Sequence, residues 1–144
     1  MSLTRLTRKP LLTIAPERTI ADAVGLLVEH RAGALAVTEG QKLVGIFSER
    51  DVMKRVVIEG MDPKTTRLAD VMTTQIITAT ESTPINEAIN LMSQHRIRHL
   101  PLVDAEGNLL GMVSLRYLLH DRLEELFEEL RSLDAFIHAD GPGG

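Results

Sequence analysis

The chain has 144 residues, of which 44% are apolar and only 3% aromatic, and its formal net charge is −4. This size suffices for one compact core, whereas the acidic balance and the scarcity of aromatic rings disfavour a nucleic-acid-binding surface. The absence of cysteine excludes disulfides, thiolate zinc sites and a cysteine nucleophile. No apolar run approaches the ~20 residues that span a bilayer, and residues 1–10 show no signal peptide. We therefore expect a cytoplasmic protein that binds neither membranes nor nucleic acid.

The first copy of an internal repeat predicts its elements in a simple order. It predicts a strand over residues 11–14, a helix after Thr19, two strands over 35–38 and 43–47, and a helix from Ser48. Thr19 lies three residues before Asp22, which is the spacing of a capping box. Residues 59–67 contain glycine, proline and threonines, and are predicted to form a linker.

The second copy repeats this order after a shift of 65 residues, which an insertion near Glu106 changes to 66. It predicts a strand over residues 76–79, a helix with Thr83 as its cap and Pro84 as its first residue, strands over 100–103 and 109–113, and a helix from Ser114. The matching pairs include Thr13 and Thr78, Ala23 and Ala88, Leu35 and Leu100, Gly45 and Gly111, and Ser48 and Ser114.

The repeat predicts an α/β fold of the α+β kind, in which two β-α-β-β-α units pack with pseudo-two-fold symmetry. A unit of this size, present twice, is too large for a solenoid repeat and too small for an ordinary domain. We therefore expect two half-domains, residues 8–58 and 68–122, that share one cleft. Any small-molecule site is expected between them.

The last helix is predicted to run past the second repeat, over residues 123–140. Glutamates lie mostly beside its apolar stripe and are expected to form a solvated face. The stripe is expected to contact a second copy of the chain; packing within the chain is the alternative. The stripe consists of Leu119, Leu123, Leu126, Phe127, Leu130, Leu133 and Ile137.

The sequence resembles a tandem pair of CBS domains, or Bateman module, of the stand-alone bacterial type, over nearly its whole length. Besides the repeat, the resemblance rests on residues 43–51 (LVGIFSERD), 71–73 (VMT) and 95–104 (HRIRHLPLVD). It implies a homodimeric regulatory module that binds an adenine nucleotide between the repeats and signals to a target protein. AMP is the favoured ligand, with ADP, ATP and NAD as alternatives. The competing hypothesis is a ligand-free homodimeric interaction scaffold.

The family resemblance also implies which residues hold the ribose. In CBS modules the pattern Gly-apolar-apolar-Ser-x-x-Asp supports an adenosine ribose, and here it covers residues 45–51. The Asp51 carboxylate would accept hydrogen bonds from the ribose hydroxyls, with Ser48 beside it. The alternative is a capping box, since the two residues also have that spacing. Tyr117 replaces the acid in the second copy, so one nucleotide per chain is expected.

By the same resemblance, Thr73 and Ile77 would face the base, and backbone groups there would recognise the adenine edge. Arg98, His99 and Arg116 would approach the phosphates, because a guanidinium binds phosphate oxygens bidentately. Arg50 and Ser114 complete the predicted set. For the three arginines the alternative is an ordinary exposed cation.

Metal binding and catalysis are not expected from this sequence. His95 and His99 are four residues apart, but His99 lies beyond the predicted end of its helix. His30 and His95 are expected to interact with helix dipoles. Ser48 has no base partner in a triad arrangement.

Overall fold

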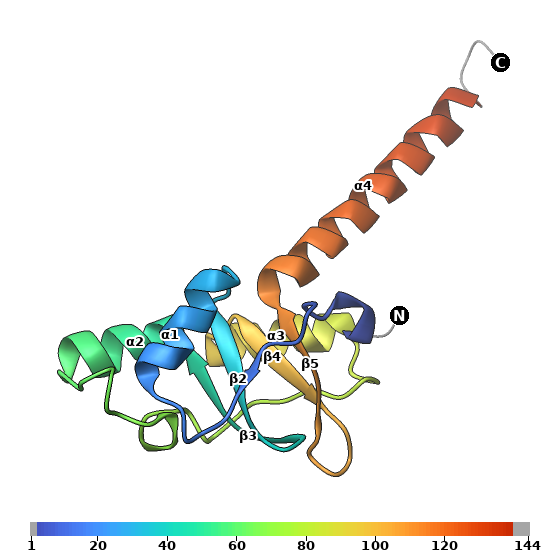
Figure 1. Cartoon of the computed structure of the whole chain (residues 1–144). Coiled ribbons are helices and arrows are strands. Elements are labelled where there is room, and N and C mark those ends of the chain that lie inside the picture. The colour runs from blue at the N-terminus through green and yellow to red at the C-terminus, as the bar shows by residue number, and fades with distance from the viewer. Residues whose placement is uncertain (1–2, 140–144) are drawn as a thin grey trace.

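The computed structural model describes residues 3–139, which form two small β-sheets with flanking helices and one projecting helix (Figure 1). The first repeat contains β1 (Thr13–Ile14), α1 (Ile20–Glu29), β2 (Ala34–Glu39), β3 (Lys42–Ser48) and α2 (Glu49–Val52), which continues as a π-helix, η2 (Met53–Ile58). The second contains α3 (Ile85–His95), β4 (His99–Val103), β5 (Leu109–Ser114) and α4 (Leu115–Ala139). The short 3-10 helices η1 (Leu3–Leu6) and η3 (Leu68–Asp70) precede the two repeats. The predicted mixed fold is confirmed.

The two sheets meet at the turns of their hairpins. In the first sheet β1 pairs parallel with β2, which pairs antiparallel with β3; the second consists of the antiparallel pair β4 and β5. Lys42 and Asn108 form an antiparallel bridge between the sheets, and the Leu109 N–H donates to the Gln41 carbonyl over 2.8 Å. This contact joins equivalent ends of the two repeats.

The strand predicted over residues 76–79 does not form, and the prediction is wrong there. Only Ala79 bridges to β4, at Leu102. In the first repeat the Ala36 N–H donates to the Leu12 carbonyl over 3.4 Å. Pro101 occupies the position equivalent to Ala36 and has no N–H to donate. The ladder therefore stops one residue short in the second repeat.

The start of α1 agrees with the sequence, whereas the start of α3 differs by one residue. Thr19 and Asp22 form the predicted capping box, with both hydrogen bonds at 3.2 Å. The Thr19 N–H is the main cause of the lowered pKa of the Asp22 carboxyl. At α3, Pro84 is the cap rather than the first helical residue, and the Thr83 hydroxyl instead accepts from the backbone N–H of Thr80. Helix ends commonly shift by this much.

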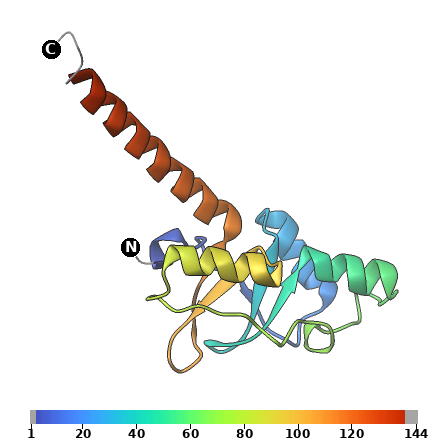
Figure 2. The same cartoon turned by 180° about the vertical axis from the view of Figure 1, so that it is seen from behind.

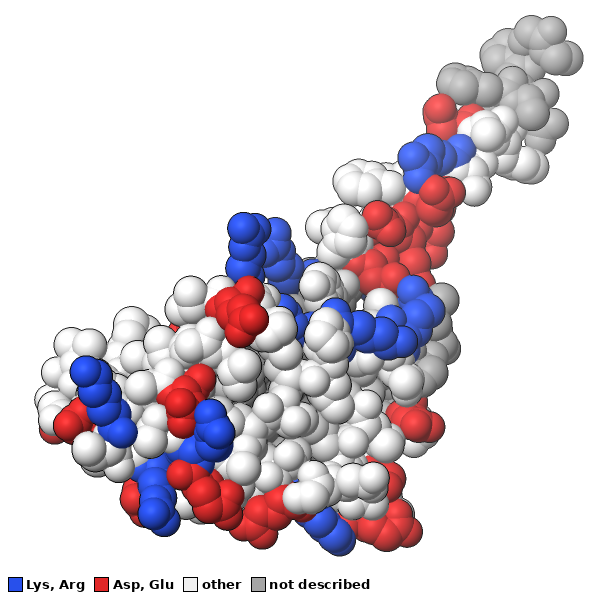
Figure 3. Space-filling view, viewed as in Figure 1, with Lys and Arg blue, Asp and Glu red and all other residues white. Residues whose placement is uncertain are grey.

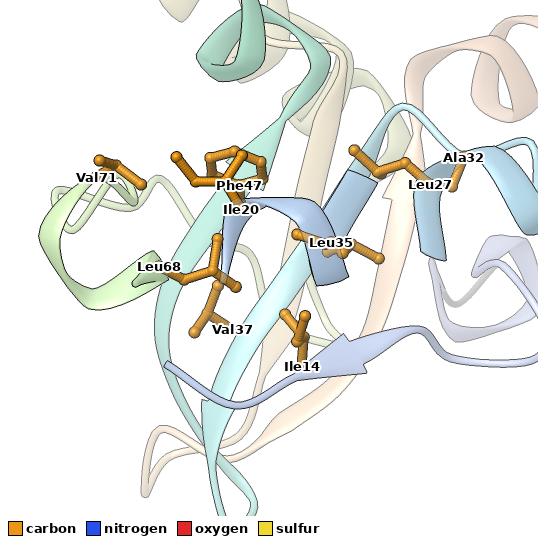
Figure 4. Close-up of a cluster of buried hydrophobic side chains, with 10 residues drawn as sticks. Ile14, Ile20, Leu27, Ala32, Leu35, Val37, Phe47, Leu68 and Val71 are labelled. Carbon is orange, nitrogen blue, oxygen red and sulfur yellow. The ribbon is translucent and has the colours of Figure 1, made fainter. Parts of the chain in front are cut away.

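The core of the first repeat includes residues that precede the second repeat. Leu68 and Val71, no more than 1% exposed, lie in one cluster with Ile20, Leu35 and Phe47 (Figure 4). We call residues 68–73 the second leading segment. It completes the apolar core of a repeat to which it does not belong in sequence.

The core of the second repeat is completed in the equivalent way. Leu3 and Leu6 at the N-terminus pack in one cluster with Leu100, Val113 and Leu118. We call residues 3–8 the first leading segment; its Leu3 corresponds to Leu68 in the repeat. The two leading segments are therefore exchanged between the repeats.

Residues 59–67, predicted as a linker, are held against α1. The carbonyls of Pro63 and Thr66 accept from the backbone N–H groups of Ala21 and Ile20, over 2.7 and 3.0 Å. These donors belong to the first helical turn, which has no partners within the helix. The segment thus helps to start α1, while the limits of the two units stay predictions.

The helix α4 leaves the body of the molecule soon after it begins (Figure 2). Leu118 is fully buried in the second core, whereas Leu119 is 45% exposed and the large apolar residues beyond it are at least as open. The end of the predicted extension, Asp140, lies outside the described residues. Among residues 3–139 no helix combines the length and apolarity that a membrane span requires.

Candidate functional site

Ser48 and Asp51 meet at the junction between β3 and α2, where they form the capping box that the spacing predicted. One oxygen of the Asp51 carboxylate, Oδ2, accepts from the Ser48 N–H over 2.9 Å and from its hydroxyl over 3.1 Å. The Ser48 Oγ accepts from the Asp51 N–H over 3.4 Å. The other oxygen, Oδ1, forms no hydrogen bond within residues 3–139. The capping interpretation is confirmed, and one carboxylate oxygen remains outside it.

Thr73 lies directly beside this junction, as part of the second leading segment. Its backbone N–H and carbonyl pair with Ile46, two residues before Ser48, over 2.9 and 3.0 Å. The Thr73 N–H is therefore occupied, whereas its carbonyl keeps one lone pair and its side chain is exposed. Contact of Thr73 with a base stays a prediction.

Gly45 permits this close approach. A Cβ atom at Gly45 would lie 2.4 Å from the sulfur of Met72, far inside van der Waals contact. Gly111 has the same relation to Thr7 of the first leading segment, at 2.5 Å. Each glycine of the repeated Gly-x-x-Ser pattern thus accommodates the exchanged segment, a role that the sequence pattern did not indicate.

His99 opens β4 and is the predicted site residue that most clearly joins the two repeats. A Cβ atom at Gly33 would lie 2.9 Å from both the Glu49 Oε1 and the His99 Cε1, so both side chains converge over this glycine. Glu49 is the first residue of α2. Burial lowers the pKa of His99, the Glu49 carboxylate opposes this, and the guanidinium groups of Arg98 and Arg8 lower it further.

We expect the free energy of unfolding to decrease as the pH is lowered, because His99 becomes protonated. Its folded pKa lies below the usual 6.5, so the unfolded chain binds the proton more tightly. The contribution is complete above pH 6.5 and is lost as the pH falls through 6.5 towards the folded pKa. Urea unfolding of the wild type and of His99→Gln, at pH 7.5 and 5.5, should show a smaller pH effect in the variant. An equal effect in both would contradict the assignment, and His95→Gln, at an exposed position on α3, serves as control.

Ser114 caps α4 as Ser48 caps α2, but only in one direction. Its hydroxyl accepts from the backbone N–H of Tyr117 over 3.3 Å, and the tyrosine offers no carboxylate in return. Ser114 lies opposite His99 in the β4–β5 ladder. Both junctions therefore have a serine hydroxyl at a helix start. They differ in that the second has the phenol of Tyr117 where the first has the carboxylate of Asp51.

The arginines of the predicted site are exposed. Within the described part of the chain Arg50, Arg98 and Arg116 form no ion pair. Arg67 and Lys54 also form no ion pair among the described residues, so the lack of an ion pair does not distinguish the three predicted arginines from other surface cations. Arg50 and Arg116 are the second residues of α2 and α4, and Arg98 immediately precedes β4.

Ile77 is half-buried against the second core. No backbone–backbone hydrogen bond involves residues 74–78 within the described chain, partly because Pro101 cannot donate to the Ile77 carbonyl. The structure thus forms two groups of residues. Ser48, Asp51 and Thr73 lie at the β3–α2 junction, and His99 and Glu49 converge over Gly33. Between residues 3 and 139 no hydrogen bond or ion pair joins Asp51 to Arg50, Arg98 or Arg116.

Sequence reasoning missed two contributors near His99. Gly33 provides the space in which His99 and Glu49 meet, and Arg8 lies close enough to affect His99 while donating to the His30 carbonyl. Arg8 corresponds to Thr73 in the repeat, and this equivalence is the signal that could have identified it. A shallow hollow of about 580 Å³ lies elsewhere, over β1 and α1. Among the described residues, no group of three potential metal ligands occurs.

Comparison with known protein families gives a match to the CBS domain over residues 3–58 and 68–132. The chain is 38% identical over 124 residues to the CBS domain-containing protein CBSX3, mitochondrial, of Arabidopsis thaliana, which covers 83% of this chain and 60% of that protein. It is 37% identical over 103 residues to the CBS domain-containing protein YhcV of Bacillus subtilis, 72% of each chain. The chain thus spans less than two thirds of the Arabidopsis relative.

Solved structures of CBS-domain proteins have a similar fold. A protein with CBS domains from Burkholderia ambifaria superposes with a TM-score of 0.78 at 32% identity, over 86% of this chain and 95% of that one. The CBS domain protein PAE2072 from Pyrobaculum aerophilum, complexed with AMP, gives 0.74 at 26% identity, over 81% and 89%. The CBS domain pair of protein MJ0100, in complex with 5-methylthioadenosine and S-adenosyl-L-methionine, gives 0.74 at 25%, over 90% and 97%.

Proposed function

Because the chain belongs to the CBS-domain family, we propose that it is a regulatory module that binds an adenine nucleotide, AMP first, beside Ser48 and Asp51. Neighbours of the same fold, complexed with AMP or with S-adenosyl-L-methionine, support a ligand of the adenosyl class. The module would act as a homodimer and report its occupancy to a target protein, without a catalytic step.

The observation that carries the proposal is the free oxygen of Asp51. The capping box uses only Oδ2, which leaves Oδ1 as an acceptor for a ribose hydroxyl. The cap also fixes the carboxylate, so little rotamer entropy is lost on binding. Capping and ribose binding are then compatible, each using its own oxygen.

The base would lie against the segment that follows Thr73. Residues 74–78 leave their backbone donors and acceptors outside the protein's own backbone–backbone hydrogen bonding within the described chain. Such groups suit the amino group and ring nitrogens of adenine, and the Ile77 side chain offers an apolar wall. In the first repeat the equivalent carbonyl, that of Leu12, is occupied because it accepts from the Ala36 N–H.

The phosphate would lie towards the starts of α2 and α4. Helix N-termini favour anions, and Arg50 and Arg116 are the second residues of α2 and α4. Arg98 immediately precedes His99 at the start of β4. Glu49 beside His99 adds one negative charge there. A carboxylate at this point disfavours long phosphate chains, which supports AMP over ADP and ATP.

Signalling requires that the ligand bind two arrangements of the repeats with different affinity. A nucleotide that contacts Asp51 in the first repeat and residues 74–78 in the second would favour the arrangement in which these walls are closest. The target protein would recognise that arrangement.

Calorimetric titration with AMP, ADP, ATP, NAD and S-adenosylmethionine tests the site. We expect one site per chain, with AMP weakened about 10- to 100-fold in Asp51→Asn, because a hydrogen bond to a charged group contributes about 1.5–3 kcal/mol. Asp22→Asn is the matched control, since it removes the same carboxylate from the other capping box. Equal effects of the two variants would contradict ribose binding at Asp51.

The alternative is a homodimeric scaffold without a ligand. The loss of the acid at Tyr117 and the exposed face of α4 favour it. If none of the five compounds produced heat or raised the melting temperature, the scaffold would replace the sensor, and Ser48 and Asp51 would be capping residues alone.

A further inference from the structure

Four charged or titratable side chains gather where the first repeat meets the second. His99 of β4 and Glu49 of α2 converge over Gly33, and the guanidinium groups of Arg8 and Arg98 lie close enough to act on His99. We call these four side chains the His99 cluster. They come from three different segments of the chain, so the fold brings them together and the local sequence does not.

Glu49 and His99 are close but do not form an ion pair. The Glu49 Oε1 lies 2.9 Å, and the His99 Nε2 3.2 Å, from the point where a Cβ atom on Gly33 would stand. The two atoms are therefore within about 6 Å of each other, the range over which one charge changes the protonation of another group. Among residues 3–139 no ion pair includes either side chain. This geometry fits a neutral imidazole beside a carboxylate.

The surroundings of the His99 cluster are basic. The Arg8 backbone N–H donates to the Met112 carbonyl over 2.9 Å, which fixes Arg8 beside the end of β5 that leads into α4. Lys and Arg side chains gather around the base of α4 (Figure 3). Arg116 belongs to the first turn of α4, and Ser114 lies opposite His99 in the β4–β5 ladder. An anion is therefore attracted to this part of the molecule.

Arg8 also has a donor that the described chain does not use. Its Nη2 donates to the His30 carbonyl, whereas its Nε is buried and forms no hydrogen bond with any described residue. Buried donors without an acceptor are rare in folded proteins. An acceptor supplied by a bound ligand would satisfy this group.

The charge of the His99 cluster falls one short of that of a 5′-phosphate. Burial lowers the pKa of His99, which is therefore neutral at pH 7, so two guanidinium groups and one carboxylate leave one positive charge. A phosphate monoester carries up to two negative charges at this pH. One proton on His99 would make the charges equal and would give Glu49 an oppositely charged neighbour.

We propose that His99 sets the charge of the phosphate that the site accepts, because it takes up a proton when an adenosine monophosphate binds beside it. This inference rests on the proposed function and adds a specificity-determining residue to it. The affinity for AMP then depends on pH, so the module responds to protons as well as to the nucleotide.

The direction of the effect follows from the charges around His99. In the free protein Arg8 and Arg98 both lower its pKa, and a bound phosphate would offset them while the Glu49 carboxylate continues to raise it. The pKa of His99 would therefore be higher in the complex, so binding takes up a proton at a pH between the two values. The AMP phosphate itself would give the opposite sign, because nearby cations favour its dianion and release a proton.

Calorimetric titration in buffers with different enthalpies of ionisation measures this proton. At pH 7.0 AMP should take up about half a proton to one proton per site, and its affinity should fall about 3- to 10-fold between pH 6.5 and 7.5. Adenosine is the matched ligand, since it has the same base and ribose but no phosphate. It should bind without taking up a proton.

Three variants assign the proton to its residue. His99→Gln should still bind AMP, but without proton uptake. Glu49→Gln removes the carboxylate, so it should bind AMP about 3- to 10-fold more tightly than the wild type at pH 8, the effect of one charge about 6 Å away in a mostly aqueous dielectric. His95→Gln, at an exposed position on α3, is the matched control and should behave as the wild type. Circular dichroism verifies that the variants are folded.

The outcomes separate this inference from the proposed function. Binding of AMP without proton uptake, or with uptake that persists in His99→Gln, would overturn the role of His99 and leave the nucleotide site in place. Equal uptake with adenosine and with AMP would also overturn it, because the phosphate would then not be the cause. If AMP did not bind at all, the proposed function and this inference would both be wrong.

Discussion

A Leu68→Ala variant should lose about 2–5 kcal/mol of unfolding free energy, the usual range for a buried leucine. The leucine is fully buried in the first core, although it precedes the second repeat. Urea unfolding followed by circular dichroism would measure the loss. Hydrogen exchange should locate it in β2 and β3, not in the repeat that follows Leu68 in sequence.

Leu3→Ala is the matched variant, because Leu3 corresponds to Leu68 and is equally buried. Its loss of free energy should be similar, but faster exchange should appear in β4 and β5, where Leu3 packs. If each variant instead loosened the repeat that it precedes in sequence, the exchange of leading segments would be wrong.

The second large effect is expected from Gly45→Ala, which should cost about 1–3 kcal/mol, the range for overpacking. The added methyl group would lie 2.4 Å from the Met72 sulfur and 3.2 Å from its Cβ atom, so rotating the methionine does not remove the whole conflict. Thermal or urea unfolding of the variant gives the value.

Two companions make this test specific. Gly25→Ala adds the same methyl group within α1, where no atom of the described residues lies within 4 Å. It should raise stability by about 0.5–1 kcal/mol because alanine is the better helix former. Gly45→Ala combined with Met72→Ala should recover part of the loss. No recovery would show that the cost of Gly45→Ala arises elsewhere in β3.

The internal repeat made most of the fold predictable from the sequence. The two hairpins, the helix starts at Ser48 and Ser114, and the capping box at Thr19 follow from local spacing and are present. Pro101 carried the information that the strand over 76–79 would fail, since a proline on β4 removes the donor that the strand needs.

Other features depend on long-range packing and were not predictable. The apolar character of Leu3 and Leu68 indicates burial but does not say in which core. The meeting of His99 with Glu49 over Gly33 requires the relative position of the two repeats. Of the predicted binding residues, local spacing explains Ser48 and Asp51, whereas the roles of the arginines stay predictions.

The exchanged leading segments limit how the two repeats can move. Neither repeat can separate from the other without withdrawing an arm, residues 3–8 or 68–73, from the core that it fills. Cleavage of the chain within residues 59–67 would consequently leave two fragments that remain associated, because each still packs its leading segment into the core of the other. Relative motion of the repeats is thereby restricted to small rotations that keep both arms seated. A target protein that senses the bound nucleotide would have to detect a pivot of this kind, not an opening of the molecule.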